Sequence, residues 1–360
     1  MKHLITTFLL IFSVTIVYGQ NDTWTLFWNN DSTLFGYKNK AGIVKIKPKF
    51  TGLTTAVKFD RILAATEKVN NGYKFYYLLK SGKIFGEDSL YVFDNATDCE
   101  SEGFIRFKDK KTDKTGMFNS RGNIVIPAVY NDLTKVRNGM VIALQGASKN
   151  RKPGSEHFSW SGGEEMLIDT ANHILVRNFK NDENINLFSL KVTKHPNSDS
   201  IRKDFKSTDG NYFSFIDFDK EFKAWLNHLL SGRLTKRNLE KASFEHITYY
   251  SNKNGWKSET SSSFINRNFN VVQSKLLELK NAGCNYTILT ESLNKMIFES
   301  DEYNSFFNNC NESDPRKYPV KTIVISYRQN HKVIQDRLAF LRTNKGYRLI
   351  EITLKSNNLR

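Results

Sequence analysis

The chain has 360 residues, of which 39% are hydrophobic and 13% aromatic, so it can bury sizeable cores and wholesale disorder is excluded. Its formal net charge is +16. The basic residues are spread along the chain without forming a stripe or a known module, which argues against a nucleic-acid partner. The 27 Phe and 15 Tyr against 6 Pro favour a β-rich fold, because aromatic side chains suit pleated, half-buried surfaces.

The N-terminus has the features of a secretory signal peptide. Lys2 precedes an apolar stretch from Leu4 to Val17, which is shorter than the roughly 20 residues needed to span a bilayer. A small residue, Gly19, follows at the exit. We therefore expect residues 1–19 to be a signal peptide cleaved after Gly19, the protein to be secreted or periplasmic, and the remaining chain to have no transmembrane segment.

Residues 20–194 are predicted to form a degenerate β-repeat domain of about four units. Gly42, Gly82 and Gly122 follow one another at intervals of 40 residues, and Asn172 takes the equivalent position after a longer step. Asn is the residue that most often replaces Gly where φ is positive. A polar insert, residues 146–163, explains the longer step, either as a recognition loop or as a neutral insertion. Each unit reads as a hairpin plus a third strand, which cannot bury its apolar face alone, so neighbouring units must stack.

Two of the units share a longer pattern: a Gly, a turn Gly six residues later, a proline and then an aromatic residue. The first unit has Gly36, Gly42, Pro48 and Phe50, and the third has Gly116, Gly122, Pro127 and Tyr130. The pattern resembles the WG-repeat (KWG-type) family, although Phe35 and Thr115 stand where the family has Trp. This resemblance covers about residues 34–192 and implies binding or scaffold modules rather than an enzyme.

The second half is predicted to be a polar linker, residues 195–208, followed by an α+β domain, residues 209–360. Apolar spacing predicts a strand, three helices and three successive antiparallel strands: 212–216; 217–232, 270–281 and 291–309; 321–327, 333–342 and 346–354. The fold class is thus a mainly β repeat array of antiparallel hairpin units, then an α+β domain ending in an antiparallel meander. Helices followed by a meander are similar to the cone-shaped domains of the nuclear transport factor superfamily, and this resemblance implies a pocket between sheet and helices.

Catalytic residues cannot be assigned from motifs. Asp217, Asp219 and Glu221 form an acidic group, but at a helix start they are explained by capping and by the helix dipole. His228 and His246 are the remaining candidates for a catalytic base. The sequence contains no metal-ligand or phosphate-binding motif, so no cofactor and no metal are expected.

The chain has three cysteines, and an exported protein meets an oxidising environment. Cys284 and Cys310 fall in the same predicted domain and are the expected disulfide, with two free buried thiols as the alternative. Cys99 would then be left over.

Together these features predict an exported, non-enzymatic binding or scaffold protein of the cell envelope that uses its β-repeat surfaces. Its partner would be a protein or an anionic glycan, and nucleic acid is not expected. The alternative is a hydrolase-like envelope enzyme with its site in the pocket of the α+β domain and the repeats as a tether. The sequence leaves the oligomeric state open.

Overall fold

The computed structural model describes residues 22–151, 154, 158–251, 255–329, 332–356 and 359. The predicted signal peptide, residues 1–19, lies outside these. The predicted fold class is confirmed: the chain is mainly β, with antiparallel hairpin sheets in the N-terminal part, few helices and a C-terminal meander.

The N-terminal part, which we call the array, comprises β1 to β21, residues 24–217. Its first sheet has the order β4-β1-β2-β3-β5-β6-β7. These strands are β1 (Trp24–Trp28), β2 (Phe35–Lys38), β3 (Val44–Phe50), β4 (Lys58–Phe59), β5 (Ile62–Val69), β6 (Gly72–Leu79) and β7 (Ile84–Phe85). A hairpin of β8 (Val92–Phe93) and β9 (Ala96–Thr97) follows.

Smaller antiparallel sheets continue the array. One sheet consists of β10 (Phe104–Asp109), β11 (Lys114–Asn119) and β12 (Ile124–Tyr130). The next consists of β13 (Asp132–Leu133), β14 (Met140–Gln145), β17 (Glu164–Asp169) and β18 (Ile174–Val176). The last has the order β19 (Ile185–Thr193), β21 (Tyr212–Asp217) and β20 (Arg202–Lys206). The predicted loop insert is a separate hairpin of β15 (Ser148–Arg151) and β16 (Phe158–Ser161).

The four predicted turn residues share one backbone geometry. Gly42, Gly82, Gly122 and Asn172 have φ of 78°, 87°, 74° and 70°. In every case the turn residue donates its N–H to the carbonyl three positions earlier, at 2.9–3.1 Å. That earlier residue in turn donates its own N–H to the carbonyl just after the turn residue, at 2.9–3.0 Å. The spacing in the sequence therefore corresponds to a repeated element of structure.

A second pair of repeat glycines is required for a different reason. A Cβ on Gly36 would lie 2.2 Å from the Ile46 carbonyl oxygen, and one on Gly116 would lie 2.7 Å from that of Ile126. Strand pairing shifts its register beside both glycines, so the neighbouring strand's backbone presses against them. Glycine here makes room for a carbonyl group, whereas glycine at the turns supplies a positive φ.

The predicted linker, residues 195–208, is wrong. Residues 202–206 form β20, which pairs with β21. Phe213 and Phe215 of β21 pack in one core with Ile142 and Leu167 of the preceding sheet. The polar composition belongs to a surface hairpin, and β21 runs directly into the first helix of the next domain.

Within its described residues, the C-terminal domain contains three α-helices and a six-stranded sheet. Its elements are α1 (Phe218–Ser231), α2 (Lys236–Lys241), β22 (Ser243–Ser251), β23 (Gly255–Thr260), α3 (Ser261–Glu278), β24 (Tyr286–Glu291), the 3-10 helix η1 (Asp301–Phe306), β25 (Val320–Gln329), β26 (Lys332–Thr343) and β27 (Gly346–Thr353). The sheet order is β23-β22-β27-β26-β25-β24, antiparallel except for the parallel pair β22–β27. The meander β25–β27 confirms the three strands predicted at the end of the chain.

The helices cover one face of this sheet and bury an apolar core that includes Phe222, Phe264 and Phe340. Among the predicted helices, 217–232 corresponds to α1, and α3 begins and ends earlier than 270–281. The helix predicted at 291–309 is wrong, because this stretch is irregular apart from η1. Its buried residues are Leu293, Phe298, Tyr303 and Phe307, whose spacing of four to five residues is too wide for one helical face.

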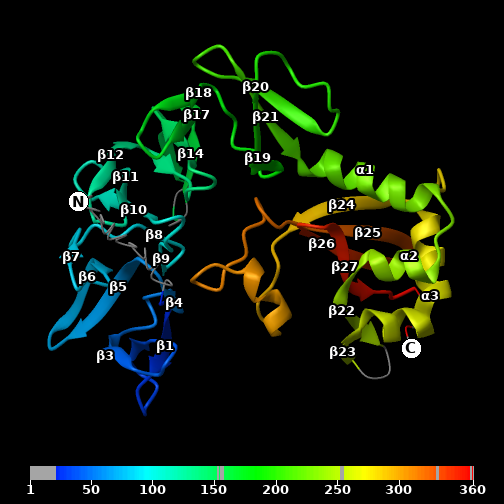
Figure 1. Cartoon of the computed structure of the whole chain (residues 1–360), viewed down its shortest axis with the longest axis horizontal. Helices are drawn as coiled ribbons and strands as arrows, with labels where there is room; N and C mark the ends of the chain where they lie inside the picture. The colour runs from blue at the N-terminus through cyan, green and yellow to red at the C-terminus, as the bar shows by residue number, and fades with distance from the viewer. Residues whose placement is uncertain are drawn as a thin grey trace, which may run out of the picture.

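These residues belong to an arm, residues 292–319, between β24 and β25. The arm packs its apolar side chains on the sheet face opposite the helices. In Figure 1 the arm, in orange, extends from the C-terminal domain towards the array, while α1 leads from β21 into that domain. The two halves are thus joined through the chain at residue 217, through the arm, and through Asn184 of the array, which accepts hydrogen bonds from Thr290 and Lys321 of the C-terminal sheet.

The two kinds of glycine predict different sensitivities to alanine. Gly36→Ala should lower the free energy of unfolding by about 3 kcal/mol, because a backbone carbonyl occupies the Cβ position. Gly42→Ala should cost about 1–2 kcal/mol, because only the positive φ opposes it. Urea denaturation measures both. Gly52→Ala is the control, since its Cβ would meet nothing within 4 Å, and an equal loss in all three variants would contradict this account.

Candidate binding cleft between the array and the arm

A disulfide fastens the arm to the array. It joins Cys99, which follows β9, to Cys310 in the arm, across 211 residues of sequence. The predicted pair Cys284–Cys310 is wrong, and Cys284 is a free cysteine. The pairing of cysteines by predicted domain fails because the arm leaves its own domain and crosses to the array.

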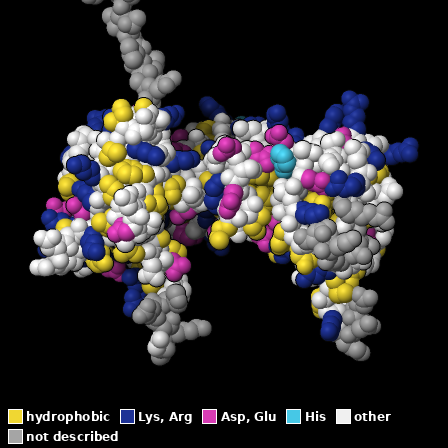
Figure 2. Space-filling model, turned by 90° about the horizontal axis from the view of Figure 1, so that it is seen from below, with side chains coloured by type: hydrophobic (Ala, Val, Ile, Leu, Met, Phe, Trp, Pro, Cys, Tyr) yellow, Lys and Arg dark blue, Asp and Glu magenta, His cyan; other side chains and the backbone are white. Residues whose placement is uncertain are grey.

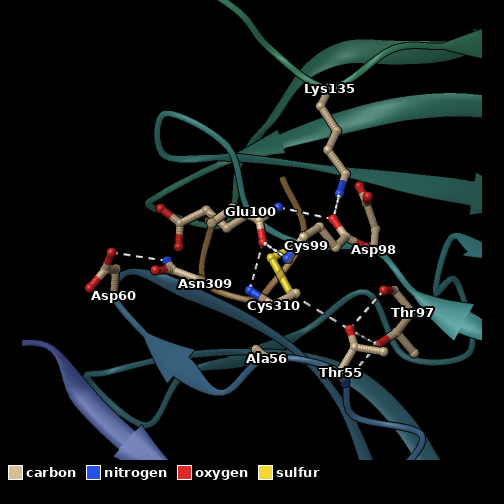
Figure 3. The surroundings of a disulfide bond; sticks show 12 residues. Thr55, Ala56, Asp60, Thr97, Asp98, Cys99, Glu100, Lys135, Asn309 and Cys310 are labelled. Carbon is tan, nitrogen blue, oxygen red and sulfur yellow. Dashed lines mark hydrogen bonds and ion pairs between the residues drawn. A yellow bond between two sulfur atoms is a disulfide. The ribbon is translucent and has the colours of Figure 1, made fainter. Parts of the chain in front are cut away.

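Hydrogen bonds of backbone and side-chain groups surround the disulfide, and Figure 3 shows those of Thr55, Asp60 and Asn309. The N–H groups of Val57 and Lys58 donate to the Asn309 carbonyl oxygen at 2.8 and 3.0 Å. The Asn309 amide donates to Asp60 at 2.9 Å, and the Thr55 hydroxyl donates to the Cys310 sulfur at 3.7 Å. The arm residues beside the disulfide therefore lie against the first sheet, next to β4.

Further along, the arm meets a later part of the array through two ion pairs. Lys135 lies 2.5 Å from Glu312, and Arg137 lies 2.8 Å from Asp314. Both basic residues come from the loop between β13 and β14. These contacts hold the arm across the array rather than at one point.

A cleft of about 640 Å³ lies between these contacts. The hairpin β8–β9, the loop β13–β14 and the arm line it. On its rim, Phe93 is 72% exposed. The lining holds six carboxylates and four basic side chains: Asp94, Asp98, Asp132, Glu183, Glu312 and Asp314, with Arg106, Lys135, Arg137 and Arg316.

Charged and aromatic side chains that are hydrogen-bonded to one another line one side of the cleft. The Arg106 guanidinium lies 4.0 Å from the centre of the Tyr91 ring and donates to both oxygens of Asp98. The Tyr91 hydroxyl donates to Asp132 at 2.9 Å. Burial opposes ionisation of Asp98, but the charge and hydrogen bonds of Arg106 outweigh it, so the pKa of Asp98 lies below its usual range. Burial also raises the pKa of Tyr91.

The arm contributes a less satisfied pair of polar groups. Arg316 is 8% exposed, and its Nη1 donates to the Asp182 carbonyl at 3.3 Å. Its nearest carboxylate is Glu183, at 3.8 Å from Nη2, and the Glu183 side chain is 72% exposed. The Ser313 hydroxyl oxygen is buried and has no hydrogen-bond partner among the described residues.

The two candidate histidines do not line this cleft. His228 is exposed on α1, and among the described residues its imidazole makes no hydrogen bond. His246 of β22 places Nδ1 3.0 Å from a Glu302 oxygen in η1, with its side chain 39% exposed. The other Glu302 oxygen is buried and unpaired among the described residues. The structure therefore does not bring the two histidines into one site.

The acidic group at the start of α1 is explained by structural contacts. Asp217 caps the helix by accepting from the backbone N–H groups of residues 219 and 220. Asp219 pairs with the buried Lys321 at 2.5 Å, and Glu221 accepts two hydrogen bonds from Arg342. Large apolar side chains fill the space between helices and sheet, and a hollow of about 300 Å³ remains beside Asp219 and Tyr286. We find no catalytic arrangement in this hollow.

The insert of residues 146–163 presents a hairpin rather than a loop. Lys149 lies 4.4 Å from the Phe158 ring centre and 5.3 Å from that of Trp160. Residues 155–157, which include His157, lie outside the described part of the chain.

On the face in Figure 2, Lys and Arg side chains are dispersed over both ends of the molecule, as the sequence predicts for solvated surface.

Comparisons with protein-family models, with curated proteins and with solved structures found no match. Within the described ranges, no helix is both long and apolar enough to cross a membrane. The same residues contain no group of three or more His, Cys, Asp or Glu side chains placed to hold a metal ion.

The disulfide is tested by peptide mapping without reduction. Digestion should release one cross-linked pair containing Cys99 and Cys310, with Cys284 recovered as a single alkylated thiol. Replacing both Cys99 and Cys310 with alanine should lower the free energy of unfolding by about 2–5 kcal/mol. The control Cys284→Ser should leave stability nearly unchanged. A cross-link between Cys284 and Cys310 would contradict the structure.

The Asp98–Arg106 pair predicts a pH dependence of stability. Because the pKa of Asp98 is lowered on folding, its contribution is complete above the unfolded value near 3.9 and is lost as pH falls through the folded value. Asp98→Asn should cost about 3–5 kcal/mol at pH 7, because it leaves the Arg106 charge buried and unpaired. The difference from the wild type should shrink in acid. Urea denaturation at pH 7 and in acid measures the loss of stability and its dependence on pH. Asp94→Asn, at an exposed position, is the control and should show neither the loss nor the pH dependence.

Proposed function

We propose that this chain is an exported, non-enzymatic binding protein of the cell envelope and that its ligand occupies the cleft between the array and the arm. The observation that carries the proposal is the cleft itself, about 640 Å³, which lies between the array and the disulfide-linked arm and is lined by charged groups and aromatic side chains. Concave sites of this size with a few convergent polar groups are typical of ligand-binding proteins.

Two further observations support this proposal. Disulfides persist in oxidising compartments, so the Cys99–Cys310 bond agrees with export and with a signal peptide at residues 1–19. The repeated turns at Gly42, Gly82, Gly122 and Asn172 give the array the regularity expected of a WG-like scaffold. We further propose that the C-terminal domain is cone-like, since its helices precede the meander and pack on one sheet face.

The lining favours one class of partner over another. Six carboxylates face four basic side chains, so an extended polyanion would meet repulsion along the cleft. A small or peptide-like ligand with mixed polar groups suits this lining better than an anionic glycan chain. The overall positive charge of the protein would then act on solubility and long-range attraction rather than on recognition in the cleft.

The test uses the full exported chain, residues 20–360, and a panel of envelope-derived peptides and small glycans. A ligand of the cleft should raise the melting temperature, because it binds only the folded state. Phe93→Ala should weaken that ligand about tenfold, since Phe93 is an exposed aromatic on the rim. Isothermal titration calorimetry measures the change.

Val92→Ala is the matched control, because Val92 lies in the same hairpin, is also exposed and does not line the cleft. Equal affinity in the Phe93 variant would place the ligand elsewhere. Turnover of a panel member that is lost in His246→Ala would favour the enzyme alternative, for which the His246–Glu302 contact is the supporting observation.

A further inference from the structure

Two buried arginines of this protein differ in how well their donors are satisfied. Arg202 is 7% exposed and donates to the Ser214 hydroxyl, the Ser214 carbonyl and the Ser189 carbonyl. Arg316 is 8% exposed, yet among the described residues its guanidinium makes one hydrogen bond, to the Asp182 carbonyl at 3.3 Å. A guanidinium has five N–H donors, and no nitrogen of Arg316 is among the fully buried atoms without a partner, so its remaining donors reach the space of the cleft that Arg316 lines.

The charge of Arg316 is also weakly compensated. The Asp314 carboxylate is paired with Arg137, whose Nε donates to both carboxylate oxygens. From Arg316 it accepts a hydrogen bond of the backbone N–H and none of the guanidinium. Glu183 is 3.8 Å away on a mostly exposed side chain, a geometry of low energetic value. Burial lowers the pKa of Arg316, and the neighbouring Arg137 lowers it further. The folded protein therefore holds a buried positive charge that lacks a close carboxylate.

An unsatisfied hydroxyl lines the same cleft. The Ser313 oxygen is buried without a hydrogen-bond partner among the described residues, and both Ser313 and Arg316 belong to the arm. Arg137, in the β13–β14 loop of the array, lines the same cleft and is near enough for its charge to lower the pKa of Arg316. Two guanidinium groups and a hydroxyl are donors suited to the oxygens of one anionic group.

We propose that Arg316, Arg137 and Ser313 form a subsite in the cleft for a single anionic group of the ligand, a carboxylate, phosphate or sulfate. This inference rests on the proposed function, in that the anionic group belongs to the cleft ligand. The group binds Arg316 directly, while Asp314 keeps Arg137 in place. One anionic group is accommodated and a chain of them is not, because the remaining lining carries the carboxylates already described.

The first experiment uses the oxidised full chain with inorganic sulfate, phosphate and acetate, and chloride at equal ionic strength as the reference. At least one of the three anions should raise the melting temperature by about 2 °C in a saturable manner. Arg316→Met should abolish that shift, and Arg316→Lys should retain part of it. A shift that is equal in wild type and Arg316→Met would identify an adventitious ion only and overturn the subsite.

A second measurement separates binding from folding. Without anion, Arg316→Met should melt at the wild-type temperature or above it, because methionine removes a poorly satisfied buried charge while keeping apolar bulk. Arg202→Met is the matched control and should lower the melting temperature by several degrees, because it removes three satisfied hydrogen bonds. A comparable loss in Arg316→Met would mean that Arg316 is a structural residue and would overturn the proposal.

The outcomes for subsite and function are distinguishable. If a cleft ligand from the panel binds Arg316→Met as tightly as wild type, the binding function stands and the anion subsite falls. If inorganic anions bind through Arg316 while no panel ligand depends on Phe93, the subsite stands and the proposed function of the cleft falls.

Discussion

The covalent bond between Cys99 and Cys310 determines where the arm lies, and the cleft exists because the arm lies there. The arm is irregular apart from η1, and ordering an irregular segment costs conformational entropy at every residue. Its apolar residues secure it to its own sheet, whereas it meets the array through hydrogen bonds, ion pairs and the packing of Cys310 on the core of the first sheet. Partly exposed ion pairs such as Lys135–Glu312 contribute little on their own. The disulfide holds the arm next to the array and so raises the effective concentration of these weakly interacting groups, which keeps their contacts formed.

The parts of the fold that the sequence predicts are those set by local chemistry. A positive φ requires Gly or Asn, and the recurrence of such residues at Gly42, Gly82, Gly122 and Asn172 identifies turns that share one geometry. Period-two alternation and a turn glycine likewise identify the terminal meander. In both cases the information lies within a few neighbouring residues.

The sequence fails where the structure depends on distant contacts. Nothing near Cys310 indicates Cys99, because the pairing follows from the path of the arm across 211 residues. The linker prediction mistakes a surface hairpin for a connection, since polar strands at a sheet edge have the composition of a loop. The cleft draws on the hairpin β8–β9, the loop β13–β14 and the arm, so no spacing reveals it. Arg316 stands in a polar stretch beside Asp314, and its burial is the signal that only the structure provides.

The charge states of Asp98 and Tyr91 agree with the binding function proposed for the cleft. General acid–base catalysis needs a group whose pKa lies near the working pH, so that it can exchange a proton during the reaction. Here Asp98 is held ionised by Arg106, and Tyr91 is held protonated by burial, so both keep a fixed state at neutral pH. Groups of fixed charge cannot shuttle protons, but they present a constant pattern to a ligand and lose no free energy to titration on binding. Arg316 also keeps a constant charge at neutral pH, because a guanidinium stays charged even when burial lowers its pKa. A disulfide-anchored wall that carries such a charge is suited to recognition of a complementary group.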